Sequence, residues 1–302
     1  MSLNTDPPSG TAAPPMQGTA RTGAQGLSSL LRTMPVTGKI GLIIVVVIIL
    51  TAVVATFWTP HDPLQAEPES RLAGSSAQHL MGTDRYGRDV LSSLMAGSQV
   101  TLLVGVVAVS IAAVIGTPLG ILAAMKRGWS EEIVMRSADM MLAFPALLLA
   151  IMTSAVMGAS TVSAMIAIGL AAGPGFARVA RAGTLQVMSS DFILAARSAA
   201  QPEMRIARRH VLPNIFGLVI IQASVTFALA ILAEAALSFL GLGTPPPDPS
   251  WGRMLQGAQD YLAIAPHLAI WPGAAIAVAV LGFNLLGDGL RDVLDPKMRQ
   301  RR

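Results

Sequence analysis

The sequence contains no cysteine and few charged residues. Asp, Glu, Lys and Arg make up 13% of its 302 residues, about half the share of a soluble domain, whereas 53% are hydrophobic. The missing thiols exclude disulfides, thiolate metal sites and a cysteine nucleophile. No metal site is expected, because the four histidines are scattered along the chain: His61, His79, His210 and His267. The low charge predicts that much of the protein surface faces lipid.

Enzyme signatures are also missing. A P-loop requires Gly-x4-Gly-Lys-Ser/Thr, and none of Lys39, Lys126 and Lys297 lies in one. Neither HExxH nor GxSxG is present. We therefore expect no catalytic residue and no cofactor bound by this chain, and any ATP must be used by another chain.

Six apolar stretches have the length needed to cross a bilayer, about 20 residues for a ~30 Å hydrocarbon core. They occupy about 40–58, 100–124, 140–157, 161–177, 212–240 and 269–289. Backbone amides in lipid must find partners within their own segment, so each stretch is predicted to be a helix. Pro118, Pro145 and Pro174 should kink or cap these helices. The fold class is an all-α polytopic membrane protein with six transmembrane helices.

The positions of Lys and Arg set the predicted orientation. With both termini cytoplasmic, 17 of the 21 lie on the inner side, as the positive-inside rule requires. Residues 1–39 then form a disordered cytoplasmic tail, 59–99 an outer loop, 100–290 the core after the first span, and 291–302 a basic cytoplasmic tail. Topology explains the basic pI, so nucleic acid is not an expected partner.

The longest inner loop, 178–211, contains a dense cationic cluster. Asp191 to Ala200 is predicted to be a short helix, and Pro202 breaks it and begins a second one. One interpretation is an interfacial basic helix that binds anionic lipid headgroups, which suits a membrane scaffold or sensor. The other is a helix–break–helix knob that a cytoplasmic protein partner grips.

The stretch LAARSAAQPEMRIARRHVLPN (194–214) resembles the cytoplasmic coupling loop, about 190–212 here, of ABC importer permeases. Leu194 stands where Glu is usual and Ala200 where Gly is usual, so the break is expected at Gln201–Pro202. The resemblance assigns contact with an ATPase subunit to Ala195, Ala196, Arg197, Ser198, Gln201, Pro202, Glu203 and Arg205.

Four further stretches resemble the C-type permease subunit of dipeptide and oligopeptide ABC importers. They are HLMGTDRYGRDVLSSLMAGSQVTL (79–102), MRSADMMLAFPALLLAI (135–151), EAALSFLGLGTPPPDPSWGRML (234–255) and PGAAIAVAVLGFNLLGDGLRDVLDP (272–296). The resemblance implies a type I ABC importer permease fold in the bacterial inner membrane, with peptides or related small solutes as cargo. It also implies membrane lipids and three kinds of protein partner: a homologous permease, two ATPase subunits that bind ATP and Mg, and an external substrate-binding protein.

Three other features have two interpretations each. The GTDRYGRD segment, with Asp84, Arg85, Arg88 and Asp89, is either a docking surface for the binding protein or an internal ion-pair network that closes an outer gate. Trp251, after a proline-rich stretch, belongs to a docking surface or to a rigid outer loop. Glu234, an acid inside a span, is functional or makes a structural hydrogen bond to a neighbouring helix.

Gly116 and Gly120 have the spacing of closely packed helices.

Overall fold

The computed structural model describes residues 33–294, and in that range it contains helices and turns but no β-sheet. Most of the predicted tails 1–39 and 291–302 lies outside the described residues. Five helices are long and apolar enough to cross a membrane, and a bent pair of helices brings the number of spans to six. The predicted all-α membrane fold is confirmed.

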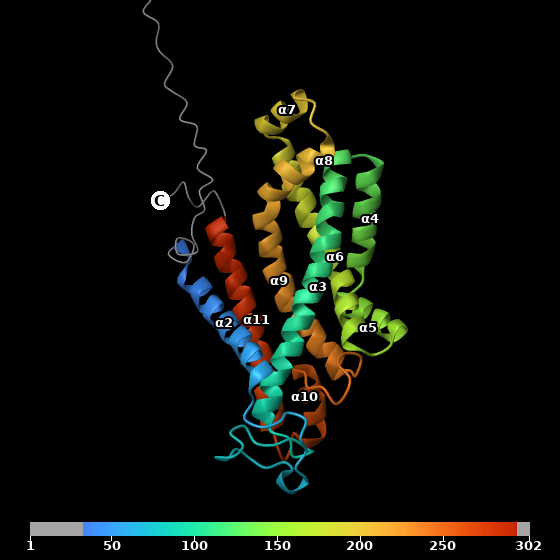
Figure 1. Ribbon diagram of the computed structural model, residues 1–302. Coiled ribbons are helices and arrows are strands. Elements are labelled where there is room, and N and C mark those ends of the chain that lie inside the picture. The colour runs from blue at the N-terminus through green and yellow to red at the C-terminus, as the bar shows by residue number, and fades with distance from the viewer. Residues whose placement is uncertain (1–32, 295–302) are drawn as a thin grey trace, which may run out of the picture. The chain divides into compact units, whose positions relative to one another are not determined.

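Five long helices form the bundle (Figure 1). They are α2 (Val36–Phe57), α3 (Val90–Lys126), α6 (Thr161–Met188), α9 (Leu212–Phe239) and α11 (His267–Leu294). Helix α3 packs along α6, α9 contacts both of them, and α2 packs against α11. Large apolar side chains such as Ile43, Val47 and Leu50 of α2 lie on the outside of the bundle, as lipid contact requires.

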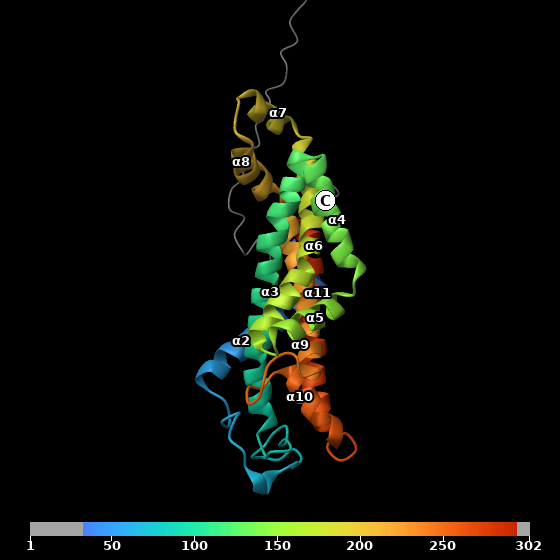
Figure 2. The ribbon, with the colours of Figure 1, turned by 90° about the vertical axis from the view of Figure 1, so that its right-hand side faces the viewer.

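The third predicted span is broken. Residues 140–157 were expected to form one helix, but α4 (Trp129–Ala143) and α5 (Ala146–Met157) meet at an angle of 90°. Pro145 is the N-cap of α5, and the residue before a proline is driven out of the helical conformation. Since α3 and α6 run in the same direction, the bent pair returns the chain between them (Figure 2).

Several helices extend beyond the apolar stretches that predicted them. Helix α3 begins at Val90 rather than near 100, because the Asp89 side chain accepts a hydrogen bond from the Ser92 amide and caps it. Helix α2 begins at Val36 rather than 40, and α6 continues to Met188 rather than 177. Hydropathy locates the part of a helix that lies in lipid, whereas capping residues decide where the helix ends.

The bundle has two different ends. The inner end carries α7 (Asp191–Ser198) and α8 (Glu203–Ile206) beside the last turn of α3, where Lys126 lies. The outer end carries the loop 59–89, with the short helix η1 (Pro68–Ser70), and α10 (Trp251–Ala258), which continues into η3 (Gln259–Tyr261). The cationic loop is therefore at the opposite end from the GTDRYGRD segment, as predicted.

Close contact between α3 and α6 depends on two glycines. A β-carbon at Gly116 would overlap the carbonyl oxygen of Gly173, and one at Gly120 would overlap that of Ala177. The predicted small-residue spacing therefore serves packing within this chain. Gly173 itself faces open space, with nothing within 4 Å of a β-carbon built on it.

We predict that Gly120→Ala destabilises the protein and that Gly173→Ala does not. The added methyl at 120 separates two backbones and should lower the free energy of unfolding by about 1–3 kcal/mol. At 173 the same change adds only helix propensity, up to about 1 kcal/mol of stabilisation. Thermal unfolding in detergent, followed by tryptophan fluorescence, measures both. Equal melting temperatures for the two variants would contradict the packing role of Gly120.

Candidate functional site

Helices α7 and α8 form a knob at the inner end, in which α8 lies beside the end of α3 and α7 projects past the ends of α3 and α4 (Figure 1). The chain turns between the two helices at Ala200, whose φ of 52° lies in the left-handed region. Pro202 is the N-cap of α8 rather than its first helical residue. The break was expected at Gln201–Pro202, but residue 200 makes the turn even though it is alanine, at a cost of about 1–2 kcal/mol relative to glycine.

The knob is fixed to the bundle by an apolar cluster. Ile193 of α7, Ile206 of α8 and Val211 are completely buried, and they pack with Ile215 of α9. Residues of α3 and α6, Ile121 and Ala180, belong to the same cluster. Between α8 and α9 the helix continues as a single π-helical segment, η2 (Ala207–Val211). A force on the knob is therefore transmitted directly to three long helices.

The predicted contact residues divide into an exposed set and a buried one. Ala196 is 6% exposed and packs in the anchoring cluster, so its side chain offers a partner little surface. Gln201 is half-buried, and its side-chain oxygen has no hydrogen-bond partner among the described residues. The exposed set is Ala195, Arg197, Ser198, Pro202, Glu203 and Arg205.

The exposed face of the knob combines charge with apolar side chains. Arg197 and Glu203 form an ion pair across the break, with Nη2 and Oε1 3.2 Å apart. Phe192, Leu194 and Met204 are exposed beside them, and Met204 is 67% exposed. Leu194, which replaces the usual Glu, therefore changes the surface of the knob and not its packing. Exposed apolar residues next to a polar rim are typical of a protein interface.

Two ion pairs that the sequence did not suggest hold α4 against α6. Arg178 of α6 contacts Asp139 of α4 at 2.5 Å, and Arg181 contacts Glu131. Both arginines belong to the inner group that set the predicted orientation. The sequence pattern identified these arginines only as charges on the inner side. Their role in linking two helices depends on the position of α4 along α6, which the pattern does not show.

At the outer end, the GTDRYGRD segment forms a compact turn. Asp84 accepts hydrogen bonds from the backbone amides of Tyr86 and Arg88, at 2.7 and 2.9 Å. The Arg85 and Arg88 guanidinium groups lie 4.7 and 5.1 Å from the centre of the Tyr86 ring. Within residues 33–294 neither arginine forms an ion pair with a carboxylate, so the predicted internal ion-pair network is not formed.

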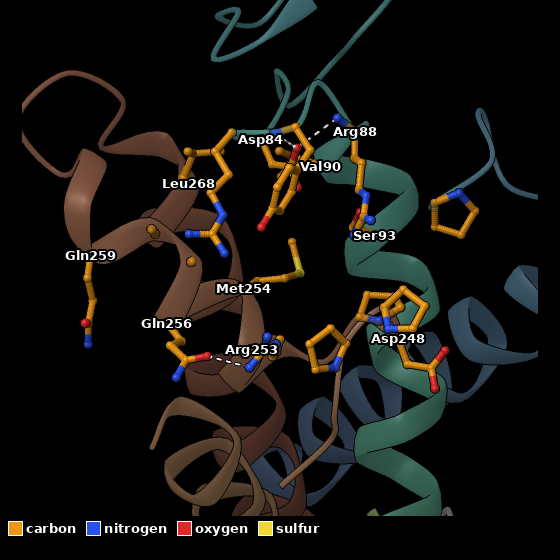
Figure 3. Close-up of a pocket in the computed structure, with 18 of the residues that line it drawn as sticks. Asp84, Arg88, Val90, Ser93, Asp248, Arg253, Met254, Gln256, Gln259 and Leu268 are labelled. Carbon is orange, nitrogen blue, oxygen red and sulfur yellow. Dashed lines mark hydrogen bonds between the residues drawn. The ribbon is translucent and has the colours of Figure 1, made fainter. Parts of the chain in front are cut away.

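This turn lines a cavity of about 380 Å³ (Figure 3). Arg88 and Asp84 lie on one side of it, and Arg253 of α10 and Asp248 on the other. The Nε of Arg88 is shielded from solvent without a hydrogen-bond partner in the described part of the chain. The cavity is therefore lined by a cationic group that has an N–H left to donate to an acceptor.

Two of the predicted docking residues are buried. Trp251 is 3% exposed, and its indole nitrogen donates a hydrogen bond to the Leu94 carbonyl at 2.9 Å while the ring packs on Gly97. Asp89 is also 3% exposed and caps α3. Both residues shape the outer end of the bundle from inside, so they cannot contact a docked protein directly.

Asp89 lies between two histidines. Its Oδ1 is 3.0 Å from Nδ1 of His79 and 3.7 Å from Nδ1 of His61. Burial alone would raise the pKa of Asp89, but hydrogen bonds from Ser92 and His79 and the charge of His61 together lower it. The three side chains bring their ligand atoms within 4.8 Å of one another, close enough that they could hold a metal ion. Spacing along the chain could not reveal this proximity, because all three lie in or beside an irregular loop.

Glu234 of α9 is buried in the bundle and bound by hydroxyl groups. Ser238 donates a hydrogen bond to one carboxylate oxygen at 2.8 Å, and Thr101 of α3 donates to the other at 3.4 Å. Ser238 in turn accepts a bond from the Thr244 amide at the outer end of α9. These contacts support the structural interpretation, a hydrogen bond to a neighbouring helix.

The sequence matches a protein family over residues 116–300. The family is described as the inner membrane component of binding-protein-dependent transport systems. A dipeptide transport system permease protein of Alkalihalophilus pseudofirmus is 42% identical over 260 residues, which cover 86% of each chain. A glutathione transport system permease protein of Escherichia coli is 42% identical over 256 residues, 84% of each chain.

A solved structure shares the fold. An inward-facing methionine ABC transporter, MetNI, contains a chain that superimposes with a TM-score of 0.54 at 20% sequence identity. The match covers 66% of this chain and 95% of that one. The likeness identifies the fold of the bundle as that of an ABC transporter chain.

We predict that Glu234→Gln retains the fold and function and that Glu234→Ala does not retain the fold. The amide keeps the volume and can still pair with Ser238 and Thr101. Alanine leaves a cavity and two unpaired hydroxyls, which should lower the free energy of unfolding by roughly 2–5 kcal/mol. Melting temperature and solute uptake by the assembled transporter test this. A folded Glu234→Gln protein without uptake would instead indicate that the carboxyl group carries protons.

Proposed function

This chain belongs to the family of inner membrane components of binding-protein-dependent transport systems, and from that premise we propose that it is a permease subunit of an ABC importer of small peptides. It pairs with a homologous permease, and two ATPase subunits bind ATP and Mg and supply the energy. An external substrate-binding protein delivers the cargo. Relatives named for dipeptide and glutathione transport support a cargo of short peptide-like solutes.

The observation that carries this proposal is the exposed and firmly anchored knob. Its Arg197–Glu203 pair and its exposed apolar side chains offer both charge and contact area, and Gln201 holds a side-chain oxygen without a partner in the described chain. A lipid-binding helix would also use cationic and apolar side chains, but anionic headgroups do not select a carboxylate such as Glu203.

The mechanism follows from how the knob is attached. When ATP binding closes the two ATPase subunits, each moves the knob that it holds. The buried cluster around Ile193, Ile206 and Ile215 passes that movement to α3, α6 and α9 as rigid bodies. The cargo path lies between the two permeases, and it opens to the outside as the helices rotate.

We predict that the double substitution Arg197→Glu with Glu203→Arg uncouples ATP hydrolysis from uptake. The swap keeps an ion pair across the break, so the knob keeps its shape, but the partner meets reversed charges. Misplaced like charges at an interface cost several kcal/mol, so uptake into proteoliposomes should fall at least about tenfold. ATP hydrolysis by the ATPase subunits is measured in parallel.

A control separates contact from folding. Arg136→Glu reverses an exposed charge of α4 that lies outside the knob, where Arg136 pairs with Glu132. It should leave uptake unchanged. Normal uptake by the charge-swapped knob would show that the ATPase grips another surface. A chain that purifies in detergent without its ATPase subunits would favour the alternative, a membrane scaffold or sensor whose basic loop binds lipid.

We further propose that the substrate-binding protein docks on the outer end, at the cavity beneath the GTDRYGRD turn. Arg88 and Arg253 are held there by surrounding structure, and Arg253 also bonds to Gln256 at 2.7 Å. Each guanidinium group suits a carboxylate of the docking protein, because the two groups form paired hydrogen bonds. Trp251 and Asp89 support this surface from below.

We predict that Arg88→Gln weakens binding of the substrate-binding protein by at least about tenfold, the loss expected when one charged hydrogen bond is removed. Arg71→Lys and Arg71→Gln are the controls outside the cavity: both remove the hydrogen bond that the Arg71 Nε donates to the Arg85 carbonyl, at 2.7 Å, but only Arg71→Gln removes the charge. Surface plasmon resonance with the transporter in nanodiscs gives the affinities. Equal losses for Arg88→Gln and Arg71→Gln would indicate general electrostatic attraction rather than a docking contact.

A further inference from the structure

Three segments of the chain meet at a single point of the outer end. His61 follows the end of α2, His79 lies in the middle of the outer loop, and Asp89 precedes α3. Their nearest nitrogen and oxygen atoms all lie within 4.8 Å of one another. The two imidazole rings are 4.7 Å apart between centroids and are tilted by 34°.

The backbone of each histidine is fixed by hydrogen bonds. The His61 amide donates to the Ser92 hydroxyl at 2.9 Å. The His79 amide donates to the Ser76 hydroxyl at 3.0 Å, and its carbonyl oxygen accepts from the Gly82 amide at 3.0 Å. Both rings are therefore held in place. Nδ1 of His79 is bonded to Oδ1 of Asp89, at 3.0 Å, whereas Nδ1 of His61 remains available to a ligand.

The two oxygens of Asp89 have different tasks. Oδ2 accepts hydrogen bonds from the Ser92 amide and hydroxyl, at 2.8 and 2.7 Å, and so caps α3. Oδ1 faces both histidines. One oxygen thus fixes the orientation of the carboxylate, and the other is directed at the point where the imidazole nitrogens converge.

One of these nitrogens has no hydrogen-bond partner. Nδ1 of His61 is shielded from solvent and makes no hydrogen bond within residues 33–294. It lies beside a cavity of about 90 Å³ that is also lined by Asp62, Gln65 and Glu67. That volume accommodates an ion with one or two waters, each of which occupies about 30 Å³. An unpaired buried nitrogen that faces a polar cavity is costly unless something binds it.

The donor set selects one class of ion. Ca²⁺ and Mg²⁺ prefer oxygen ligands throughout, and Cu⁺ prefers thiolates, whereas two imidazoles with a carboxylate suit Zn²⁺ and similar divalent ions. Donor atoms around tetrahedral Zn²⁺ lie about 3.3 Å apart, given bonds of about 2.0 Å. The observed separations of 3.0 and 3.7 Å lie on either side of this value.

We propose that His61, His79 and Asp89 bind a divalent transition-metal ion of the Zn²⁺ class. Water from the adjacent cavity completes the coordination. The ion would fasten the end of α2 and the outer loop to the capped start of α3. The proposal rests on these three side chains alone and does not depend on the transport function.

The direct test uses the full-length protein in detergent, purified with an affinity tag that contains no histidine. After treatment with a chelator and equilibration with Zn²⁺, elemental analysis should find one ion per chain. His61→Ala removes a ligand without removing a hydrogen bond of the ring, and should weaken Zn²⁺ binding at least about 100-fold. His210→Ala, at the opposite end of the bundle, should bind Zn²⁺ as the unmodified chain does.

A second measurement replaces one of the three proposed ligands with cysteine and follows the reactivity of its thiol. Because the chain has no cysteine, His61→Cys introduces a single thiol. Zn²⁺ should protect this thiol from alkylation by a maleimide, and adding His79→Ala should abolish the protection. The proposal is overturned if the unmodified protein retains no Zn²⁺, if His61→Ala retains as much, or if protection persists without His79. Any of these results would leave the group as a hydrogen-bond network around the α3 cap.

Discussion

The close contact between α3 and α6 is the constraint on which the other features depend. Gly116 and Gly120 allow the backbones of the two helices to touch, so the helices pack closely along their length. The outer end of this pair begins at the Asp89 cap, beside the candidate metal ligands. Its inner end contributes Ile121 and Ala180 to the cluster that anchors the knob. The surface proposed to receive a binding protein and the surface proposed to receive an ATPase are thus joined by one pair of helices.

At both ends of the bundle, buried residues support charged groups that line the surface. At the inner end Ile193 and Ala196 hold the knob, while Arg197 and Glu203 face outward. At the outer end Trp251 holds α10 against α3, while arginines line the cavity above it. In both places a rigid base presents charged groups whose positions are fixed before any partner arrives, which reduces the entropy lost on binding.

The sequence predicted the fold well because lipid imposes a simple rule. Apolar stretches of spanning length must be helices, and the bias of Lys and Arg orients them, so the bundle and the inner position of the knob followed from composition. The ends of the helices could not be predicted in this way, because a polar capping residue such as Asp89 lies outside the apolar stretch. The break at Pro145 was visible as a proline, but its 90° angle depends on how α4 and α5 pack.

The site was predicted less completely, for reasons that differ among residues. The proline-rich stretch before Trp251 suggested a docking surface or a rigid outer loop, yet Gly97 provides space for the tryptophan ring in the core. The turn was expected at Gln201–Pro202, because alanine rarely adopts the left-handed conformation. In the structure Ala200 itself adopts this conformation. His61, His79 and Asp89 share no periodicity, so only the folded loop reveals that they converge.

The unbroken course of the chain from α8 through η2 into α9 has a mechanical consequence. Helix α9 alone is about 42 Å long, at 1.5 Å for each of its 28 residues, which exceeds the thickness of the hydrocarbon core. Glu234 lies near its far end, bound to Thr101 of α3. Under the proposed function, a displacement of the knob in the cytoplasm would therefore reach the opposite side of the membrane through one continuous helix rather than through a loop.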